Sequence, residues 1–249
     1  MSSRASLERT LDTVRNVPGW LHDAQATRLW DAAGRVREGG QIVEIGSYQG
    51  RSTIVLARGA ADNVTVVSID PHAGDDRGPG EWKGSPEDGR RDHTAFLEHL
   101  RTRGLSGRVH HVCGASSSAH REVAGEIDLL YVDGSHRYRV ALDDLRRWGS
   151  RVREGGTMFV HDTYASLFVT AATYRSVALS SRWRYVGRER SLAEYRREEL
   201  RGRALVANVV RQLAEFPWFA RNLTVKVLCA LRLESLAGVL GHRKGEDIY

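Results

Sequence analysis

The stretch from Glu126 to His136 is the part of the sequence whose residue types and spacing point most directly to chemistry. Residues 127–132 are mostly apolar, which is typical of a strand buried inside a parallel sheet. This segment ends at Asp133, and His136 follows after a Gly-Ser pair. Ligands bind beyond the carboxyl ends of the strands in open α/β sheets, so these two side chains are placed to hold a metal ion or to move a proton. The alternative is an Asp that caps the next helix beside a surface His.

Two more predicted strands also end at a carboxylate. Residues 64–70 end on Asp70, and Asp162 follows the strand predicted over residues 157–161. If the strands before Asp133 and Asp162 are neighbours, the two acids converge on one hard cation, for which oxygen ligands select magnesium, calcium or manganese. Asp70 is placed to accept hydrogen bonds from ribose hydroxyls, although it could instead cap the turn before a proline.

A glycine-containing turn follows the first predicted strand, residues 41–46. Its pattern is Glu44-x-Gly46-x-x-x-Gly50, and a helix is predicted directly after it over residues 51–57. Glycines let the backbone turn tightly and approach a ligand, and the start of a helix offers free N–H groups to a carboxylate or phosphate. The turn has only two of the three glycines of the dinucleotide fingerprint, which disfavours a dehydrogenase. An ordinary strand-to-helix turn is the alternative.

Strands and helices alternate along the predicted domain. That order indicates a parallel sheet with helices on both faces. A polar insert over residues 71–91 has no apolar period, and loops of that length are usually functional or disordered. The expected strands lie at 41–46, 64–70, 109–113, 127–132 and 157–161, with an edge strand at 183–186. Entry helices are expected over residues 11–36, interrupted at Pro18-Gly19-Trp20, and further helices at 51–57, 92–103 and 138–148.

The C-terminal part differs in character, so we expect a main domain over residues 1–200 and a helical appendage over residues 201–249. Apolar residues recur at helical spacing over 205–216 and again over 225–239, which predicts two amphipathic helices. Such helices usually pack on their own domain or across a homodimer interface, and we expect a homodimer. Basic residues beside the apolar ones keep open a peripheral contact with a membrane face or a lipid-linked substrate. These basic residues are Arg221, Lys226, Arg232, Arg243 and Lys244.

Composition limits the partners and the compartment. The 249-residue chain is 41% hydrophobic and carries a net charge of +6, which favours anionic ligands. The basic residues are spread out and form no named binding motif, so we expect no stable nucleic-acid partner. Cys113 and Cys229 form neither a disulfide framework nor a zinc-binding spacing, and residues 1–15 lack an apolar signal core. No apolar run reaches the roughly 18 residues of a membrane span, and we expect a cytoplasmic protein.

Taken together, four motifs resemble the class I S-adenosylmethionine-dependent methyltransferases over about residues 15–200. More narrowly, the sequence is similar to the metal-dependent O-methyltransferases, a group that includes catechol O-methyltransferase and the macrolide-sugar methyltransferases. The whole chain also resembles the mycobacterial methyltransferases linked to methylated mannose polysaccharides. The resemblance implies a Rossmann-like, seven-stranded, mostly parallel sheet. The motifs are Glu44-Ile-Gly-Ser-Tyr-Gln-Gly50, Ser68-Ile-Asp70, Asp128-Leu-Leu-Tyr-Val-Asp-Gly-Ser-His136 and Gly155-Gly-Thr-Met-Phe-Val-His-Asp-Thr163.

The resemblance also implies positions for the cofactor, S-adenosylmethionine. Its methionine end, its ribose and its adenine would each contact a different strand end. The implied cofactor-binding residues are Glu44, Gly46, Ser47, Gly50 and Ser52 in the first turn, Asp70 for the ribose, Ala115 and Ser116 beside the adenine, and Asp133.

By the same resemblance, Asp133 and Asp162 bind Mg²⁺ or Mn²⁺. His136 stands where catechol-type members carry a Lys base and sugar-type members carry a His. The sequence departs from the catechol pattern after the last motif strand, where Asp-Asn is replaced by the Asp162-Thr163 pair with His161 before it. His161 is therefore the first candidate for the third metal ligand and Thr163 is the second, and a bound water could take the place of either.

The expected activity is magnesium-dependent transfer of a methyl group to a hydroxyl of a sugar or oligosaccharide, with methylated mannosides among the expected acceptors. The polar insert would act as a lid, with Trp82 either stacked on a sugar ring or anchoring the loop. The enzymatic alternative is methylation of a small-molecule phenol or natural product. A non-catalytic cofactor-binding module is the alternative from another class, but such a module has no need of Asp133, His136 and Asp162 together.

Overall fold

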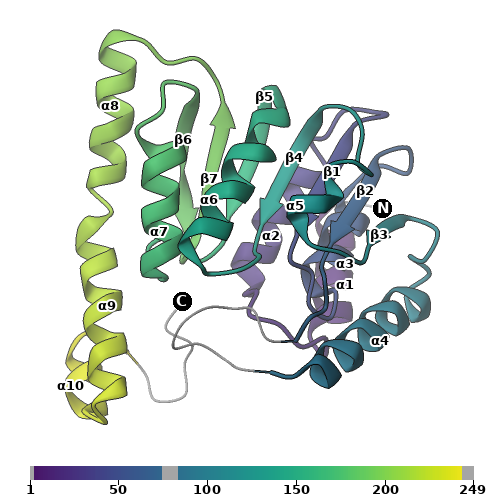
Figure 1. The fold of residues 1–249 in the computed structure, drawn as a ribbon, viewed down its shortest axis with the longest axis horizontal. Helices are drawn as coiled ribbons and strands as arrows, with labels where there is room; N and C mark the ends of the chain where they lie inside the picture. The colour runs from purple at the N-terminus through teal and green to yellow at the C-terminus, as the bar shows by residue number, and fades with distance from the viewer. Residues whose placement is uncertain (1–2, 75–83, 243–249) are drawn as a thin grey trace.

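One sheet of seven strands runs through the part of the protein that the structure describes (Figure 1). The computed structural model describes residues 3–74 and 84–242, apart from the side chain of Glu234. The strand order is β3-β2-β1-β4-β5-β7-β6; β1 to β5 are parallel, β7 is antiparallel to β5, and β6 is antiparallel to β7. This confirms the Rossmann-like, mostly parallel sheet. The strands are β1 (Gln41–Ile45), β2 (Thr65–Ile69), β3 (Val109–Val112), β4 (Ile127–Val132), β5 (Val152–Val160), β6 (Trp183–Glu189) and β7 (Leu192–Arg197).

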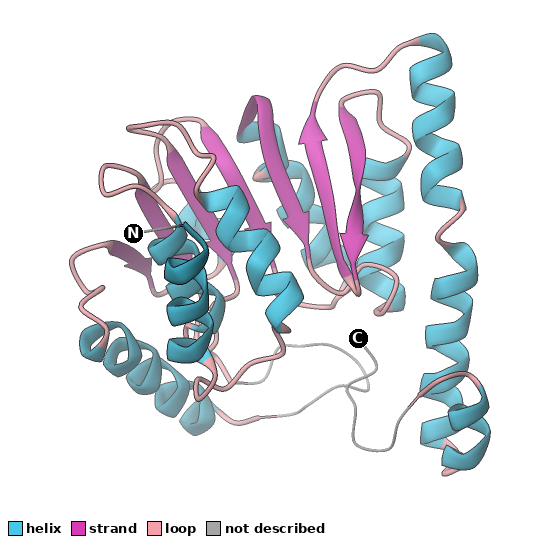
Figure 2. Ribbon diagram, turned by 180° about the vertical axis from the view of Figure 1, so that it is seen from behind, coloured by secondary structure: helices cyan, strands magenta, loops and turns pink. Residues whose placement is uncertain are grey.

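Helices cover both faces of the sheet, as Figures 1 and 2 show from opposite sides. The first four helices in the chain pack on one face, and α5 to α7 pack on the other. The helices are α1 (Ser3–Val14), α2 (Asp23–Ala33), α3 (Arg51–Gly59), α4 (Pro86–Thr102), α5 (Ser116–Ala119), α6 (Tyr138–Arg147), α7 (Leu167–Thr173), α8 (Gly202–Leu213), α9 (Phe216–Ala230) and α10 (Glu234–Val239), with a 3₁₀ turn at Gly149–Arg151 and a π-helical turn at Tyr174–Ala178.

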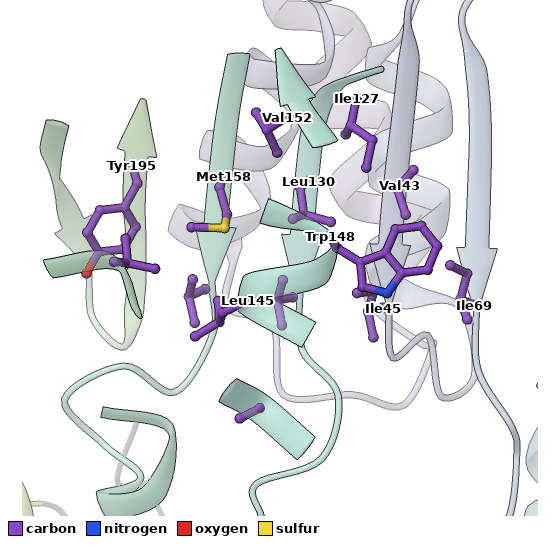
Figure 3. Close-up of a cluster of buried hydrophobic side chains, with 14 of the residues drawn as sticks. Val43, Ile45, Ile69, Ile127, Leu130, Leu145, Trp148, Val152, Met158 and Tyr195 are labelled. Carbon is purple, nitrogen blue, oxygen red and sulfur yellow. The ribbon is translucent and has the colours of Figure 1, made fainter. Parts of the chain in front are cut away.

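The two faces of the sheet carry separate apolar cores because side chains alternate along each strand. In β1, Val43 and Ile45 belong to the core under α6, whereas Ile42 belongs to the core under α2 and α3. Figure 3 shows the first of these cores, in which Trp148 at the end of α6 is fully buried against the strands. All six residues of β4 are buried, which explains why this strand is mostly apolar along its whole length.

The structure corrects the boundary of the polar insert. α4 begins at Pro86 and not at the predicted Asp92, because Ser85 and Asp88 form a capping box at its start. Each side chain of the pair accepts a hydrogen bond from the backbone N–H of the other residue, which satisfies donors that a helix start leaves free. The insert is therefore shorter than predicted, and Trp82, assigned to the lid, lies outside the described residues.

The C-terminal helices run along the β6 edge of the sheet (Figure 1). Asn208 of α8 accepts a hydrogen bond from the Tyr185 backbone N–H (2.7 Å) and donates one to the Trp183 carbonyl (3.0 Å). These bonds occupy backbone groups that an open sheet edge would leave exposed. The C-terminal part is helical as predicted, but the second predicted helix, over residues 225–239, is wrong in its bounds, because α9 ends at Ala230 and α10 begins at Glu234. The domain boundary, the homodimer and the membrane contact stay predictions. Among the described helices, none has the length and apolar character needed to cross a membrane.

Candidate active site

A pocket of about 190 Å³ lies at the carboxyl ends of β1, β2 and β4. Its walls come from the glycine turn, the loop after β2, and the residues that follow β3 and β4. Most of the predicted cofactor positions therefore meet at one place. Those that line the pocket are Gly46, Ser47, Ser52, Asp70, Ala115, Ser116 and Asp133, whereas Glu44 and Gly50 lie behind it.

Gly46 is required by the close approach of two strand ends. Its φ of +86° lies in the left-handed region, and a Cβ added there would stand 2.2 Å from the carbonyl oxygen of Asp133. Any side chain at this position would force the ends of β1 and β4 apart. The glycine thus brings the first turn directly against the segment that carries Asp133 and His136.

Asp70 holds the glycine turn in place through backbone hydrogen bonds. Its Oδ2 accepts from the N–H groups of Ser47 and Tyr48, both at 2.8 Å, and its Oδ1 accepts from the His72 N–H at 2.7 Å. Asp70 therefore fixes the shape of the pocket. Its side chain also lines the pocket, so the predicted contact with a ribose stays a prediction.

Glu44 supports the same turn from below. It is fully buried, and its two carboxylate oxygens accept hydrogen bonds from the hydroxyls of Ser52 and Thr53 on α3, both at 2.5 Å. Burial raises the pKa of Glu44 to about 7, against the lowering effect of the two hydroxyls. In this structure Glu44 anchors the start of α3 and is not among the residues that line the pocket.

Polar groups inside the pocket suit the ends of a nucleoside cofactor. The Ser47 hydroxyl oxygen is buried and has no hydrogen-bond partner within the described part of the chain. A carboxylate or an amine placed beside it would satisfy this group and the free N–H groups at the start of α3. The methionine end of S-adenosylmethionine has both of these groups, so the pocket fits that cofactor.

Asp144 is a pocket residue that we did not predict. Ser116 donates a hydrogen bond to its Oδ1 (2.5 Å), and burial raises the pKa of Asp144 to about 6. The signal in the sequence was an acid on the apolar face of the helix over residues 138–148, next to Leu145. A buried acid at this position can serve as a hydrogen-bond acceptor or donor for the adenine end of the cofactor.

Next to the pocket, Asp133, His136 and Asp162 form what we call the acid–histidine cluster. One ligand atom from each lies within 4.8 Å of the others. The Nε2 atom of His136 is 2.8 Å from Oδ2 of Asp162. β4 and β5 are neighbours in the sheet, which is why the acids at their ends converge as predicted.

His161 and Thr163, the two candidates for a third metal ligand, differ in their surroundings. His161 is buried, with its Nδ1 atom 3.3 Å from Oδ1 of Asp133 and 3.3 Å from Oδ2 of Asp162. The Thr163 hydroxyl instead donates to the Val160 carbonyl (3.2 Å). The structure therefore places His161 closer to the acids, although His136 is the residue that completes the compact cluster.

The acids and histidines of this region strongly shift one another's pKa. Burial alone would raise the pKa of Asp162, but His161 and His136 outweigh it and hold that pKa well below its usual range. Burial lowers the pKa of His161, and the two acids Asp133 and Asp162 more than reverse this, so its pKa is raised. A site that stabilises a proton between two carboxylates also attracts a cation.

The donors present fit a magnesium or manganese ion. Oδ1 of Asp162 and Nε2 of His161 are buried and lack hydrogen-bond partners among the residues that the structure covers. Carboxylate oxygens are preferred ligands of magnesium, and manganese also accepts an imidazole nitrogen. The Asp133 and Asp162 carboxylates would hold such an ion, with His136 or His161 beside it.

Tyr131 supports the cluster from inside β4. Its side chain is fully buried, and its hydroxyl donates a hydrogen bond to Oδ2 of Asp133 (2.8 Å). Burial raises the pKa of Tyr131 well above its ordinary value, so the hydroxyl keeps its proton and remains a donor. Sequence reasoning missed this role, although a tyrosine among the aliphatic residues of a buried strand was the available signal.

Comparison with known proteins agrees with this geometry. A family model described as a methyltransferase domain matches residues 43–163. Among solved structures, cofactor-bound Rv0187 from MTB is 18% identical with a TM-score of 0.57, covering 78% of this chain and 90% of that one. An O-methyltransferase from Bacillus cereus in complex with SAH is 16% identical with a TM-score of 0.54, covering 80% and 93%. The SAH-bound methyltransferase PaMTH1 of Podospora anserina is 16% identical with a TM-score of 0.56, covering 80% and 89%.

At these identities the solved structures show the fold alone, and it is the methyltransferase fold. The matched domain spans the glycine turn, Asp70, Asp133 and Asp162. Together the two findings support a class I S-adenosylmethionine-dependent methyltransferase.

Proposed function

We propose that this protein is a magnesium-dependent O-methyltransferase that acts on a hydroxyl group of a sugar or oligosaccharide. The observation that carries the proposal is the acid–histidine cluster beside the pocket. Asp133 belongs to both, since it lines the pocket and supplies a ligand atom to the cluster. An acceptor held at the cluster would therefore lie next to a cofactor held in the pocket.

Each bound group would contribute one chemical property. S-adenosylmethionine supplies the electrophilic methyl group, and a divalent cation lowers the pKa of an acceptor hydroxyl. The side chains of this protein would hold these groups in place and accept the proton. The carboxylates of Asp133 and Asp162 would hold the cation, and the Tyr131 hydroxyl orients Asp133.

His136 is the proposed general base. An imidazole has an unperturbed pKa of about 6.5, which suits proton transfer near neutral pH. Its Nε2 atom lies 2.8 Å from Asp162, so the acid orients the ring beside the cation position. Positioning the acceptor oxygen against the methyl group would supply much of the rate enhancement.

The sugar acceptor rests on two features of the sequence. His136 stands where sugar-type members of the resembled group carry their His, and the whole chain resembles methyltransferases linked to methylated mannose polysaccharides. A phenol or a natural product remains the second acceptor class.

The test is a methyl-transfer assay with labelled S-adenosylmethionine and a panel of mono- and oligosaccharides and phenols. We expect transfer to a sugar hydroxyl with magnesium present and none in excess chelator, with recovery when magnesium is restored. Transfer that is unchanged in excess chelator would refute the metal assignment. Transfer to phenols alone would refute the sugar acceptor and leave the metal chemistry intact.

A matched pair of variants tests the base. His136→Ala should bind S-adenosylhomocysteine with unchanged affinity, because His136 does not line the pocket, and should lose most of its turnover. His110→Ala, which removes an exposed His on β3, is the control. Near-normal turnover of His136→Ala would remove His136 from the role, whereas loss of metal binding in that variant would make it a ligand.

A further inference from the structure

A second group of possible metal ligands lies outside the acid–histidine cluster. His72 in the loop after β2, His93 in α4 and His111 in β3 each offer one ring nitrogen, and these three nitrogens lie within 4.8 Å of one another. We call these residues the histidine cluster. They come from three separate elements, so only the fold brings them together.

Two of the three rings have a buried nitrogen that accepts or donates no hydrogen bond within the part of the chain that the structure describes. Nε2 of His72 and Nε2 of His111 have no hydrogen-bond partner within residues 3–74 and 84–242. His72 is itself nine-tenths buried, with 9% of its surface exposed, and its φ of +45° is a strained conformation for a non-glycine residue. Buried polar atoms normally have partners, so these two nitrogens point to a bound group.

The tautomer of His111 suits a metal ligand. Its Nδ1 atom lies 3.1 Å from the carbonyl oxygen of Ser68. A carbonyl can only accept, so Nδ1 carries the proton and Nε2 presents its lone pair. A histidine ligand commonly donates its other ring N–H to a backbone carbonyl in this way.

Burial also favours the neutral rings that metal binding needs. It lowers the pKa of His72, and it lowers the pKa of His111 to about 4. Asp70 and Asp92 face His72 and oppose this effect, and neighbouring histidines reinforce it. Neutral imidazoles bind a metal without first losing a proton.

We propose that the histidine cluster binds a transition-metal dication, with zinc as the ion of choice. Zinc takes imidazole ligands in tetrahedral sites, here three histidines and a water. Magnesium and calcium prefer oxygen ligands and are disfavoured. A Zn–N distance of about 2.0–2.1 Å places ligand nitrogens about 3.4 Å apart, which lies within the 4.8 Å limit of the three nitrogens in the structure.

The ion would act as a structural clamp beside the pocket. α4 already packs against the loop after β2, because a Cβ on Gly89 would stand 1.9 Å from the His72 carbonyl oxygen. His72 lines the pocket, and its backbone N–H bonds to Asp70, which holds the glycine turn. An ion shared by the loop, α4 and β3 would therefore fix one wall of the pocket.

The competing explanation is an aromatic packing cluster without an ion. The rings of His72 and His93 stack with centroids 4.7 Å apart, and Phe96 lies 4.4 Å from the ring of His111. Such contacts stabilise a core without any metal. The experiment must therefore measure the ion itself.

The test uses the untagged full chain, loaded with zinc, passed through a desalting column and analysed for metal by mass spectrometry. We expect the wild type to retain one zinc per chain more than His93→Ala and His111→Gln. His110→Gln, on the exposed side of the same strand, should retain as much zinc as the wild type. Zinc should also raise the melting temperature of the wild type and of His110→Gln by more than it raises that of the other two variants.

Three outcomes would overturn the proposal. Equal zinc retention in wild type and His93→Ala would assign the cluster to packing alone, as would a wild type that retains no zinc. Loss of the retained zinc in Asp162→Asn, with no loss in His93→Ala, would assign the ion to the acid–histidine cluster. If His111→Gln fails to fold, the zinc retention of His93→Ala alone tests the proposal. His93 is only half-buried on the surface of α4, so its replacement should leave the fold intact.

Discussion

The buried acid Glu44 gives a prediction that follows directly from the structure. Its pKa is raised from 4.5 to about 7 by burial, while in the unfolded chain it keeps its ordinary value. The folded protein therefore holds a proton that the unfolded chain has lost between these two pH values, and stability falls as the pH rises through this window. At about 1.4 kcal/mol per pKa unit, the full cost above pH 7 is about 3 kcal/mol.

Replacing Glu44 with Gln should remove this pH dependence. The amide keeps the shape of the side chain, and the Ser52 and Thr53 hydroxyls can rotate so that one donates to it and the other accepts. Between pH 5 and pH 8, the unfolding free energy of the wild type should fall by about 2–3 kcal/mol more than that of Glu44→Gln.

Urea unfolding of both proteins at several pH values measures this difference, because all other titrating groups are shared and cancel. Glu122→Gln removes an exposed acid and serves as the control. Parallel stability curves for the wild type and Glu44→Gln would refute the argument, since they would mean that Glu44 is ionised in the folded protein at no cost.

Two more predictions concern the metal. Tyr131→Phe removes the hydroxyl that orients Asp133 and should weaken magnesium binding about 10- to 100-fold, measured by calorimetry, while S-adenosylhomocysteine binding is unchanged; equal magnesium affinity in both proteins would contradict the role of Tyr131. Magnesium affinity should also rise with pH, because the raised pKa of His161 keeps a proton between the acids that the ion must displace. Displacing one proton gives about a tenfold change per pH unit, and a flat profile would rule out this competition.

The parallel half of the sheet was predictable because its strands are buried on both faces. The prediction located all five strands, and β1, β2 and β4 appear in the sequence as short, mostly apolar runs before a turn. The start of β5 was wrong: the strand begins at Val152 and includes Gly155 and Gly156, which were predicted to form the turn before it. The helix over residues 138–148 was also found, since Ala141 and Leu145 mark its apolar face.

The antiparallel edge was harder to find. β7 lies in a segment dense in charge, and its buried residues, Leu192, Ala193 and Tyr195, are interrupted by exposed or half-exposed Glu and Arg. The residues alone indicated only the strand near Trp183, and the seventh strand came from the family resemblance. α7 was missed as well, because its seven residues are too few to show a helical period.

Within the site, the sequence identified residues at strand ends and missed residues that act from elsewhere. Asp133, His136 and Asp162 were found because strand order brings them together. Asp144 reaches the pocket from a helix, and Tyr131 supports Asp133 from inside a strand. Such contacts depend on how elements pack, which spacing in one sequence does not reveal.

The central claim is that the carboxylates of Asp133 and Asp162 hold one divalent ion beside the pocket. The most direct measurement is Mn²⁺ binding, followed by electron paramagnetic resonance with S-adenosylhomocysteine present, in the wild type, Asp162→Asn and His136→Ala. The account predicts one bound Mn²⁺ in the wild type and in His136→Ala, and its loss in Asp162→Asn. Equal Mn²⁺ binding in the wild type and Asp162→Asn would contradict the account.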